Sequence, residues 1–390
     1  MILHCISNLM SGGAEAMLCR LVTRSATHGV GHQVVSMLPN GIFADELQAR
    51  GIPVHNLCEQ SDRSRLPAIT RFAKLVRAIR PDVIQAWMYH ANFIVSVAAP
   101  LYATRVPVIW NVRQTLPSLR GETPRTQLVI VGCAPMSWHP RAIVYNALTA
   151  AVDHEAWGYN SARRLIIPNG FDLARFKPDF EARSRLSRSL GLPEDALILG
   201  RVARLHPMKD FDTLFQAFNR VAASEKRAHL VLAGRGMNAS EPELSALIGA
   251  SSAKDRIHLL DETSRIDRIV PAFDIALSTS ARSEAFPNVI GEAMACGVPV
   301  VATDIAESAS IVNDPTRIVP PRNPDAFAAR VLALLALSAD ERKRIGACDR
   351  ARIEAAYPLD RITAVYEGLW QSTAAGLRSG RDVQADVVSS

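Results

Sequence analysis

Cysteine, aromatic residues and long hydrophobic runs are all scarce in this sequence of 390 residues. The six cysteines are scattered without the close pairs of a metal site, which favours reduced thiols that are buried as small apolar residues: Cys5, Cys19, Cys58, Cys133, Cys296 and Cys348. No segment approaches the roughly 18 uninterrupted apolar residues of a membrane-spanning helix. The opening MILHCISNLMSGG has no basic region before its short apolar run. We therefore expect a cytoplasmic protein, neither secreted nor spanning a membrane.

The composition is that of an ordinary globular protein, with 48% hydrophobic and 21% charged residues, which excludes disordered and fibrous proteins. The charge is uneven, because residues 1–170 hold 16 Lys and Arg against 9 Asp and Glu while the whole chain has a net charge of +6. This basic part should meet something anionic. No zinc-finger, helix-turn-helix or aromatic-basic pattern accompanies the charge. We therefore expect an anionic membrane surface or a lipid-linked substrate as partner, and no nucleic acid.

Short apolar runs alternate with amphipathic segments along the chain. The first runs predict strands at ILHCIS, GHQVVSML, IPVHNL, DVIQAW and VPVIWNV, with helices near residues 14–27, 43–50, 67–79 and 91–103. The pattern starts again at LILGRVA, with strands at HLVLAG, IHLL, IALSTS and VPVVAT and helices near residues 211–223, 241–250 and 287–296. Such alternation is typical of βαβ units, in which helices cover both faces of a parallel sheet.

We therefore predict an α/β protein with two Rossmann-like, doubly wound domains that face a central cleft. The expected segments are a first domain at 1–172, a charge-rich linker at 173–195, a second domain at 196–355, a helix at 356–375 that crosses back to the first domain, and a disordered tail at 376–390. In open parallel sheets of this kind, ligands bind beyond the carboxyl ends of the strands.

Two carboxylates stand eight residues apart in the segment SARSEAFPNVIGEAMACGVPVVATD. Pro287 suits the first turn of a helix and Gly297 the position just past its end, so Glu284 precedes this helix and Glu292 lies within it. Asn288 and Glu292 share one face at i, i+4 spacing. The start of the helix suits an anion such as phosphate. The alternative, that Glu284 only caps the helix and Glu292 is only solvated, stays open on these residues alone.

Two cations follow the first strand of the second domain, in RVARLHPMKDF. Arg204 and Lys209 lie at the carboxyl end of this strand, where they could clamp a diphosphate. A structural salt bridge is the alternative.

The segments RVARLHPMKDFDTLFQAF, SEAFPNVIGEAMACGVPVVATD, IPNGFDLARFKP and SGGAE resemble the spaced motifs of glycosyltransferase family 4, which are retaining nucleotide-sugar enzymes of the GT-B fold. The resemblance covers nearly the whole chain and points to the bacterial surface-polysaccharide type. It implies transfer of a sugar from a UDP-sugar or GDP-sugar to a hydroxyl of a glycan or lipid-linked glycan acceptor, in the synthesis of cell-surface polysaccharide or glycolipid. The first domain would be the acceptor side and the second would bind the nucleotide-sugar, without another cofactor.

The resemblance also implies roles for single residues. Arg204 and Lys209 would neutralise the charge that grows on the departing diphosphate. Glu284 would hold hydroxyls of the transferred sugar, and Glu292 would accept hydrogen bonds from the ribose. The rest of the donor site would consist of the helix start and of a glycine pair that allows close approach of the backbone: Phe286, Pro287, Asn288, Val289, Gly12 and Gly13.

Some positions depart from the pattern of the family. Arg113, in VIWNVRQT, stands where many members have a histidine near the donor sugar. In DVIQAWMYHAN, Gln85 and Trp87 replace common histidines while His90 is kept, and we expect these residues to face the acceptor. Arg113 and His90 are therefore acceptor-side candidates, although a structural role for His90 stays open. We interpret other histidines as structural, His32 and His154 among them.

The DFD triplet matches the D-x-D that binds a divalent ion in a different glycosyltransferase fold. Here Asp210 and Asp212 open a predicted helix and suit its first turn, so we predict no metal site.

Two other classes of protein fit the sequence less well. A dinucleotide-dependent oxidoreductase would need G-x-G-x-x-G, which GGAE lacks. A non-catalytic GT-B subunit that only binds partners would be expected to lose the two carboxylates and two cations, and all four are present.

A last pattern concerns the location of the protein. Residues 63–81 form an amphipathic segment with four cations on one side, and we hypothesise that it docks the protein peripherally on the inner face of the cytoplasmic membrane.

Overall fold

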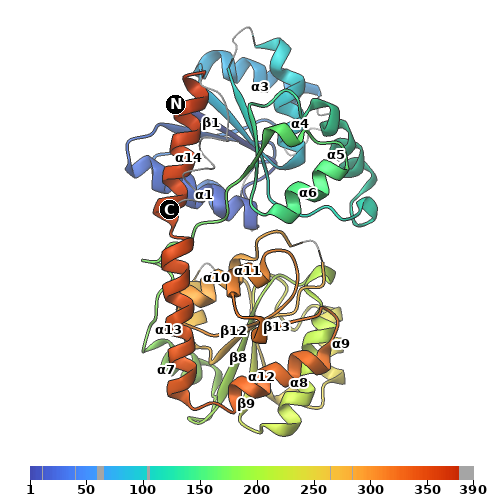
Figure 1. Cartoon of the computed structure of the whole chain (residues 1–390), viewed down its shortest axis with the longest axis vertical. Coiled ribbons are helices and arrows are strands. Elements are labelled where there is room, and N and C mark those ends of the chain that lie inside the picture. Colours follow the sequence, from blue (N-terminus) through green and yellow to red (C-terminus); the bar gives the residue numbers. More distant parts are fainter. Residues whose placement is uncertain are drawn as a thin grey trace. The chain divides into compact units, whose positions relative to one another are not determined.

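The computed structural model describes residues 1–10, 12–39, 41–58, 66–102, 106–263, 265–282 and 284–376. The chain divides into two compact units (Figure 1). Unit 1 consists of Met1–Gly170 together with the segment that begins at Leu359, and unit 2 is Phe171–Pro358. The expected disordered tail falls almost entirely on residues 377–390, outside the described residues. In the described part of the chain, none of the helices combines the length and the apolar character needed to cross a membrane.

Unit 1 is built on a parallel sheet of seven strands in the order β3-β2-β1-β4-β5-β6-β7. The strands are β1 (Ile2–Ile6), β2 (His32–Ser36), β3 (Val54–Asn56), β4 (Val83–Trp87), β5 (Val108–Val112), β6 (Ala142–Tyr145) and β7 (Arg164–Ile166). The helices are α1 (Gly13–Thr27), α2 (Ile42–Ala49), α3 (Leu66–Ile79), α4 (Met88–Ala98), α5 (Pro124–Met136), α6 (Leu148–Ala156) and α14 (Leu359–Ala374), with short 3₁₀ turns η1 (Ala99–Leu101), η2 (Leu119–Gly121) and η3 (Ser161–Arg163).

The last helix, α14, completes the core of unit 1. It packs beside α1, as Figure 1 shows. Its buried side chains follow helical spacing and join the apolar residues of the sheet in one cluster: Leu359, Ile362, Tyr366, Leu369 and Trp370. The first domain is thus made from both ends of the chain.

Unit 2 is built on a parallel sheet of six strands in the order β10-β9-β8-β11-β12-β13. The strands are β8 (Leu197–Val202), β9 (Ala228–Ala233), β10 (Ile257–Leu260), β11 (Ile275–Ser278), β12 (Val300–Thr303) and β13 (Ile318–Val319). The helices are α7 (Ala182–Leu190), α8 (Phe211–Ser224), α9 (Pro242–Ala250), α10 (Asn288–Ala295), α11 (Ser308–Val312), α12 (Pro324–Leu335) and α13 (Ala339–Ala356). Short 3₁₀ turns are η4 (Pro207–Lys209), η5 (Lys254–Arg256), η6 (Ile266–Arg268), η7 (Val270–Ala272) and η8 (Pro315–Arg317).

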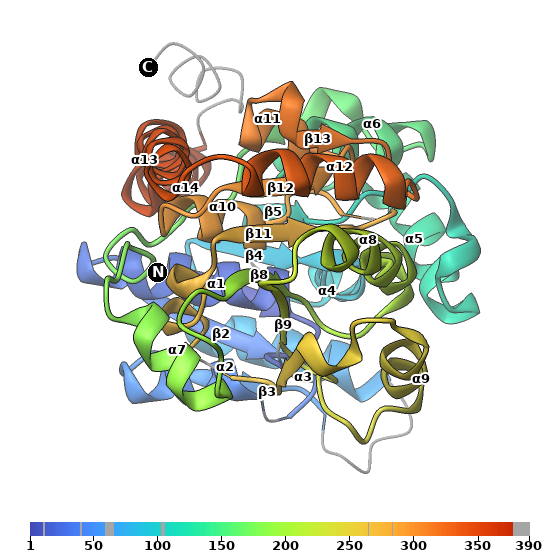
Figure 2. The same ribbon diagram turned by 90° about the horizontal axis from the view of Figure 1, so that it is seen from below.

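Helix α8 illustrates how the sequence produces the packing of unit 2. Asp210 caps its first turn, and four buried side chains form one stripe at i, i+3, i+4 and i+7: Phe211, Leu214, Phe215 and Phe218. This stripe faces the sheet, and α12 packs beside α8 (Figure 2). A second cluster of buried residues includes α10, which packs against α13.

The predicted fold class is confirmed, since both units contain a parallel sheet in βαβ winding. The strand order of unit 2 and of the first six strands of unit 1 is that of a dinucleotide-binding fold, with the change of direction between β1 and β4 and between β8 and β11. The functional limits of the domains stay a prediction. Within the expected linker lies α7, whose Ala182 and Leu186 belong to a core cluster of unit 2.

Gly291 allows α10 to lie close to the rest of unit 2, because a Cβ atom at this position would overlap the ring of buried Phe171. We expect Gly291→Ala to destabilise unit 2 by about 1–3 kcal/mol, as overpacking does. Gly249→Ala is the matched control, since it lies in α9 with open space around it and should stabilise by about 0.5–1 kcal/mol. Urea unfolding of both variants measures this, and equal stability of the two would contradict the close approach.

Candidate functional site

The turn between β8 and α8 places Lys209 at the carboxyl edge of the unit 2 sheet. Asp210 begins α8 by accepting hydrogen bonds from the backbone N–H of Thr213 at 3.2 Å and from its hydroxyl at 2.7 Å. Asp212 lies in the first turn of α8 and is exposed. The two aspartates of DFD therefore stabilise a helix start. Among the described residues, no group of three or more His, Cys, Asp or Glu is placed to hold a metal ion.

Lys209 and Glu284 form an ion pair between the turns that follow β8 and β11, which are neighbours in the sheet. The Nζ of Lys209 donates to Oε1 of Glu284, and the hydroxyl of Ser280 donates to the same oxygen at 3.0 Å. The two charged side chains are only 15% and 14% exposed. Arg204, the other predicted cation, is exposed on the same turn as Lys209, with its guanidinium 3.8 Å from Sδ of Met208.

Arg201 lies beneath the Lys209–Glu284 ion pair, and its place in the site was not predicted from the sequence. It is part of β8 and is 1% exposed. Burial lowers the pKa of Arg201 to about 10, while Glu284 and Asp210 act in the opposite direction, so it remains a cation at neutral pH. The available signal was an arginine inside the apolar run LILGRV, because charged residues are seldom fully buried unless they are paired.

The carboxylate of Glu284 is ionised at neutral pH. Burial raises its pKa, but the charges of Lys209 and Arg201 and the hydrogen bonds from Lys209 and Ser280 outweigh burial and hold the pKa below its ordinary value. An ionised carboxylate accepts hydrogen bonds only, so this position suits hydroxyl groups of a ligand.

Helix α10 supplies the second predicted carboxylate. Glu292 lies in α10 and is 7% exposed. Pro287 is the N-cap of this helix, one position before the predicted first turn, and Gly297 has the positive φ of 74° that ends it. Phe286 is buried against the rings of Phe171 and Tyr357, with ring centres 6.1 and 5.4 Å away. The helix start, from Asn288 and Val289, is therefore held beside Glu284 with its positive dipole end at the carboxyl edge of the sheet.

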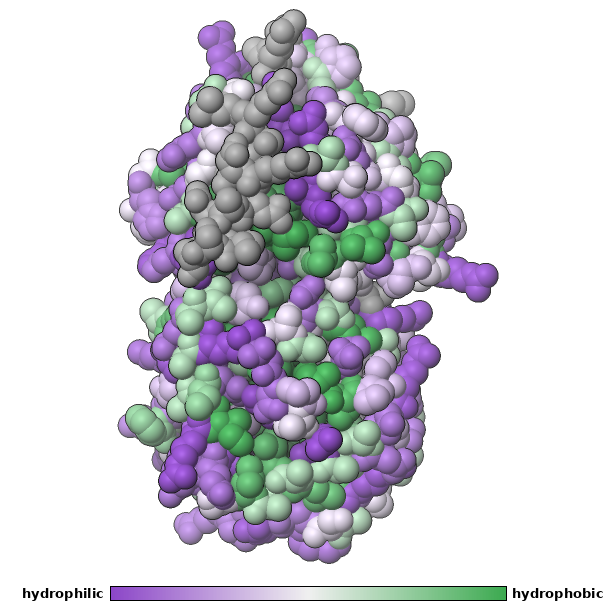
Figure 3. Space-filling model, viewed as in Figure 1, coloured by the Kyte–Doolittle hydropathy of each residue, from purple (hydrophilic) through white to green (hydrophobic). Residues whose placement is uncertain are grey.

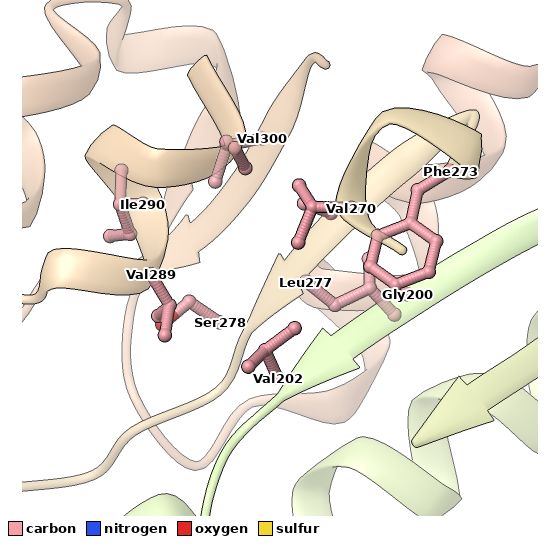
Figure 4. Close-up of a pocket in the computed structure, with 11 residues that line it drawn as sticks. Gly200, Val202, Val270, Phe273, Leu277, Ser278, Val289, Ile290 and Val300 are labelled. Atoms are coloured by element: carbon pink, nitrogen blue, oxygen red, sulfur yellow. The ribbon is translucent and has the colours of Figure 1, made fainter. Parts of the chain in front are cut away.

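One pocket lies between β8, β11 and α10 (Figure 4). Its lining contains no charged residue, and Phe273 lies next to Gly200 inside it. Such a lining does not fit a diphosphate. The pocket therefore gives no support for an anion site, and the predicted site near Lys209 stays a prediction.

In unit 1, the candidate residues follow three strands that are neighbours in the sheet, β1, β4 and β5. Gly12 is the N-cap of α1 and Gly13 its first residue. The backbone of Gly12 is extended, and an added Cβ would meet only the flexible side chain of Glu15. His90 is half-buried in the first turn of α4, and Arg113 directly follows β5. These residues thus share the carboxyl edge of one sheet.

Arg113 takes part in a hydrogen-bond network that reaches α14. Its guanidinium donates to the side-chain oxygens of Asn111 at 2.9 Å and Tyr366 at 3.1 Å, and also to that of Asn169. It lies 5.4 Å from the ring centre of Trp87. Arg113 therefore joins β5 to α14, and its part in substrate binding stays a prediction.

Gln85 and Trp87 do not face an acceptor, contrary to the expectation from sequence, because both are fully buried. Gln85 accepts a hydrogen bond from the indole N–H of Trp370 at 2.5 Å, and the indole N–H of Trp87 donates to His4 at 3.2 Å. The residues instead pack beneath α14 and beside β1.

His32 and His154 have the structural role that was predicted. His32 lies 3.1 Å from a ring nitrogen of His4, and His154 bonds to the hydroxyl of Tyr89 at 2.8 Å. Burial lowers the pKa of each to about 4, so both are neutral at physiological pH.

Comparison with known proteins gives two family matches that lie side by side on the chain. The model described as "Glycosyltransferase Family 4" matches residues 11–175, and "Glycosyl transferases group 1" matches residues 196–337. D-inositol 3-phosphate glycosyltransferases are similar in sequence. That of Geodermatophilus obscurus is 30% identical over 273 residues, which are 65% of this chain and 58% of the relative. This chain thus spans less than two thirds of the length of that protein.

The protein of the same name from Kribbella flavida is 26% identical over 96% of this chain and 92% of the relative. Among solved structures, HepE of Anabaena in complex with UDP and glucose superposes with a TM-score of 0.84 at 20% identity, over 95% of this chain and 99% of that one. The two family matches together cover most of the chain, and the likeness in structure extends to both units. The chain therefore belongs to the family 4, group 1 glycosyltransferases and has the GT-B fold.

Proposed function

We propose that the protein moves a sugar from a nucleoside-diphosphate sugar to a hydroxyl of a glycan or lipid-linked glycan, with retention of the anomeric configuration. The observation that carries this proposal is the Lys209–Glu284 ion pair at the carboxyl edge of β8 and β11, with the start of α10 beside it. These groups suit a nucleotide-sugar. The cation and the helix start can bind its diphosphate, and the ionised carboxylate can accept hydrogen bonds from its hydroxyls.

The reaction breaks the bond between the anomeric carbon and the oxygen of the diphosphate, which leaves with additional negative charge. Lys209, together with Arg204 on the same turn, would stabilise this charge, and the N–H groups at the start of α10 would add to it. When the diphosphate binds Lys209, the ammonium group of Lys209 contacts both the diphosphate and Glu284. Glu284 can then accept hydrogen bonds from the sugar, while Glu292 on α10 accepts them from the ribose.

The donor and acceptor classes can be narrowed for testing. HepE was crystallised with UDP and glucose, which makes UDP-glucose the first donor to test, before other UDP-sugars and GDP-sugars. The excess of positive charge in residues 1–170 suits an anionic acceptor. The names of the curated relatives suggest inositol 3-phosphate as a small acceptor to test beside lipid-linked glycans. Synthesis of surface polysaccharide or glycolipid is the proposed setting.

Attachment to the inner face of a membrane is part of this proposal. The apolar side of α3 packs inward, since Phe72 and Val76 are fully buried. The exposed side chains that α3 and the next residue offer to a membrane include four cations: Arg71, Lys74 and Arg77 in the helix, and Arg80 directly after it. Each cation near an anionic surface contributes about 1 kcal/mol. On the face drawn in Figure 3, hydrophobic side chains are interspersed among hydrophilic ones.

Helix α5 would add apolar contact to the same layer. Helices α3, α4 and α5 pack in a row. Leu128 on α5 is 75% exposed and Trp138, two residues past its end, is 69% exposed. Exposed apolar groups on α5 and exposed cations on α3, in one layer of helices, fit a peripheral membrane surface that is held by charge and not by a spanning segment.

Glu284 and Glu292 should affect different parameters, because one is assigned to the reacting sugar and the other to the ribose. We expect Glu292→Gln to weaken binding of UDP or GDP, and Glu284→Gln to lower turnover with nucleotide affinity little changed. Calorimetry with the nucleoside diphosphates and rates of nucleotide-sugar hydrolysis, measured without acceptor, separate the two effects. Equal losses of nucleotide affinity in both variants would contradict this division.

The leaving group should depend on side-chain cations and not on a metal ion. We expect Lys209→Met or Arg204→Met to lower kcat by roughly 100-fold or more with the fold intact. Excess EDTA should leave the wild-type rate unchanged. Loss of activity in EDTA that magnesium or manganese restores would assign the diphosphate to a metal instead, and near-normal turnover of Lys209→Met would refute its role.

Membrane attachment should depend on charge in unit 1. We expect the protein to sediment with liposomes rich in anionic lipid at roughly 50 mM salt and to be released at roughly 300 mM, because salt screens the attraction. Lys74→Gln with Arg80→Gln should weaken binding. The matched control removes the same charge from exposed positions of unit 2, Lys226→Gln with Lys254→Gln. Absence of binding at low salt, or equal loss in both double variants, would contradict docking through α3.

A further inference from the structure

We infer that Arg201 is a positioning residue, which holds Lys209 and Glu284 in the arrangement that the transfer reaction needs. This inference rests on the proposed function for what Lys209 and Glu284 do. Arg201 lies in the middle of the charged cluster but is almost completely buried, so it acts through the two residues and not on the substrate.

The guanidinium of Arg201 links the three segments that build the site. It donates to the carbonyl oxygen of Leu277 in β11 at 3.0 Å, to that of Lys209 at 3.3 Å, and to the hydroxyl of Ser280 at 3.4 Å. The hydroxyl of Ser280 in turn donates a hydrogen bond to Oε1 of Glu284 at 3.0 Å. One side chain therefore fixes the backbone that carries Lys209 and, through Ser280, the carboxylate that pairs with it. The planar fork of arginine can make these contacts at once, whereas a lysine cannot.

The charges around Arg201 support the same role. Two cations, Arg201 and Lys209, lie near two carboxylates, Glu284 and the helix cap Asp210. If Arg201 were absent, Glu284 would have Lys209 as the one cation of this pair, and the charge of Lys209 would be less available to a diphosphate. Arg201 thus keeps Lys209 and Glu284 closely paired and at the same time leaves the cluster able to accept an anion.

A purely structural role explains Arg201 less well. Leu197 and Leu199 precede it in β8 as buried apolar residues, and an apolar side chain at position 201 would avoid the cost of burying a charge. In addition, Nε of Arg201 has no hydrogen-bond partner among the described residues. An unsatisfied buried donor lowers the stability of the fold, so stability alone does not explain an arginine at this position.

The same sheet provides a matched control. Arg256 is half-buried and donates to the carbonyl oxygens of Ala222, Glu225, Lys226 and Ala228, directly before β10 begins. It therefore ties backbone segments together as Arg201 does, but at the amino edge of the sheet and away from the charged cluster. Replacing Arg256 measures the effect of losing such an arginine on stability alone.

The experiment compares the full-length wild type with Arg201→Met, Arg201→Lys and Arg256→Met. Steady-state hydrolysis of the nucleotide-sugar gives kcat and KM, calorimetry gives UDP affinity, and thermal unfolding reports the fold. We expect Arg201→Met to lower kcat by roughly 10-fold to 100-fold, as misplaced groups do, with KM changed less than about threefold. Arg256→Met should lose stability without loss of kcat. Arg201→Lys should recover only part of kcat, because it keeps the charge but not the fork.

The pH profile distinguishes positioning from general destabilisation. Glu284 faces Lys209, Arg201 and Ser280, and Asp210 faces Arg201. Because Arg201 helps to lower the pKa of Glu284, which acts in its ionised form, its loss should move the acidic limb of kcat to higher pH. Arg201→Lys should restore this limb, and Arg256→Met should leave it unchanged.

The results for the Arg201 and Ser280 variants decide whether Arg201 is a positioning residue. If Arg201→Met does not fold, Ser280→Ala tests the same link, with the acidic limb again moving to higher pH. Unchanged kcat and pH profile in the folded Arg201 or Ser280 variant would overturn the positioning role, and so would equal kcat losses in Arg201→Met and Arg256→Met. A wild type that neither binds a nucleoside diphosphate nor hydrolyses any nucleotide-sugar would instead contradict the proposed function, and the inference with it.

Discussion

The ion pair between Lys209 and Glu284 is the interaction on which the candidate site of unit 2 depends. A buried carboxylate is unfavourable unless it is paired and hydrogen-bonded. Here the strand order supplies the partner, because β8 and β11 lie side by side although their sequences are far apart. At this point the connections from neighbouring strands run to opposite sides of the sheet, which leaves room for a ligand above the pair. Fold and site are thus two consequences of one topology.

Much of this arrangement could be predicted from local patterns. The alternation of apolar runs located the strands β1 to β5 and β8 to β12, and the cap and stop signals of α10 were predicted to within one residue. Glu284 and Glu292 were placed correctly relative to this helix. These features succeed because turn residues and helix periodicity act over a few neighbouring residues.

Features that depend on distant segments could not be predicted in this way. Gln85 and Trp87 lie at and near the end of a predicted strand, which suggested a site, but their partners Trp370 and His4 come from distant segments. Arg201 looks like an exception in an apolar strand, and its partners come from β11 and the turn after it. The charge of residues 173–195 suggested a linker, although two apolar residues of α7, Ala182 and Leu186, are buried in the core of unit 2. Between residues 114 and 165 no element was assigned, although α5, which contains a proline, and also β6 and α6 lie there.

The return of the chain to unit 1 has a consequence for biosynthesis. Unit 2 is continuous in sequence, so its core can close as soon as its residues have been made. The core of unit 1 closes later, because its Tyr366 and Trp370 belong to α14, which follows the whole of unit 2 in sequence. Until then, the apolar residues of the sheet that pack against α14 in the finished fold lack this cover. The nascent protein therefore passes through a stage in which the half made first is the half that folds last.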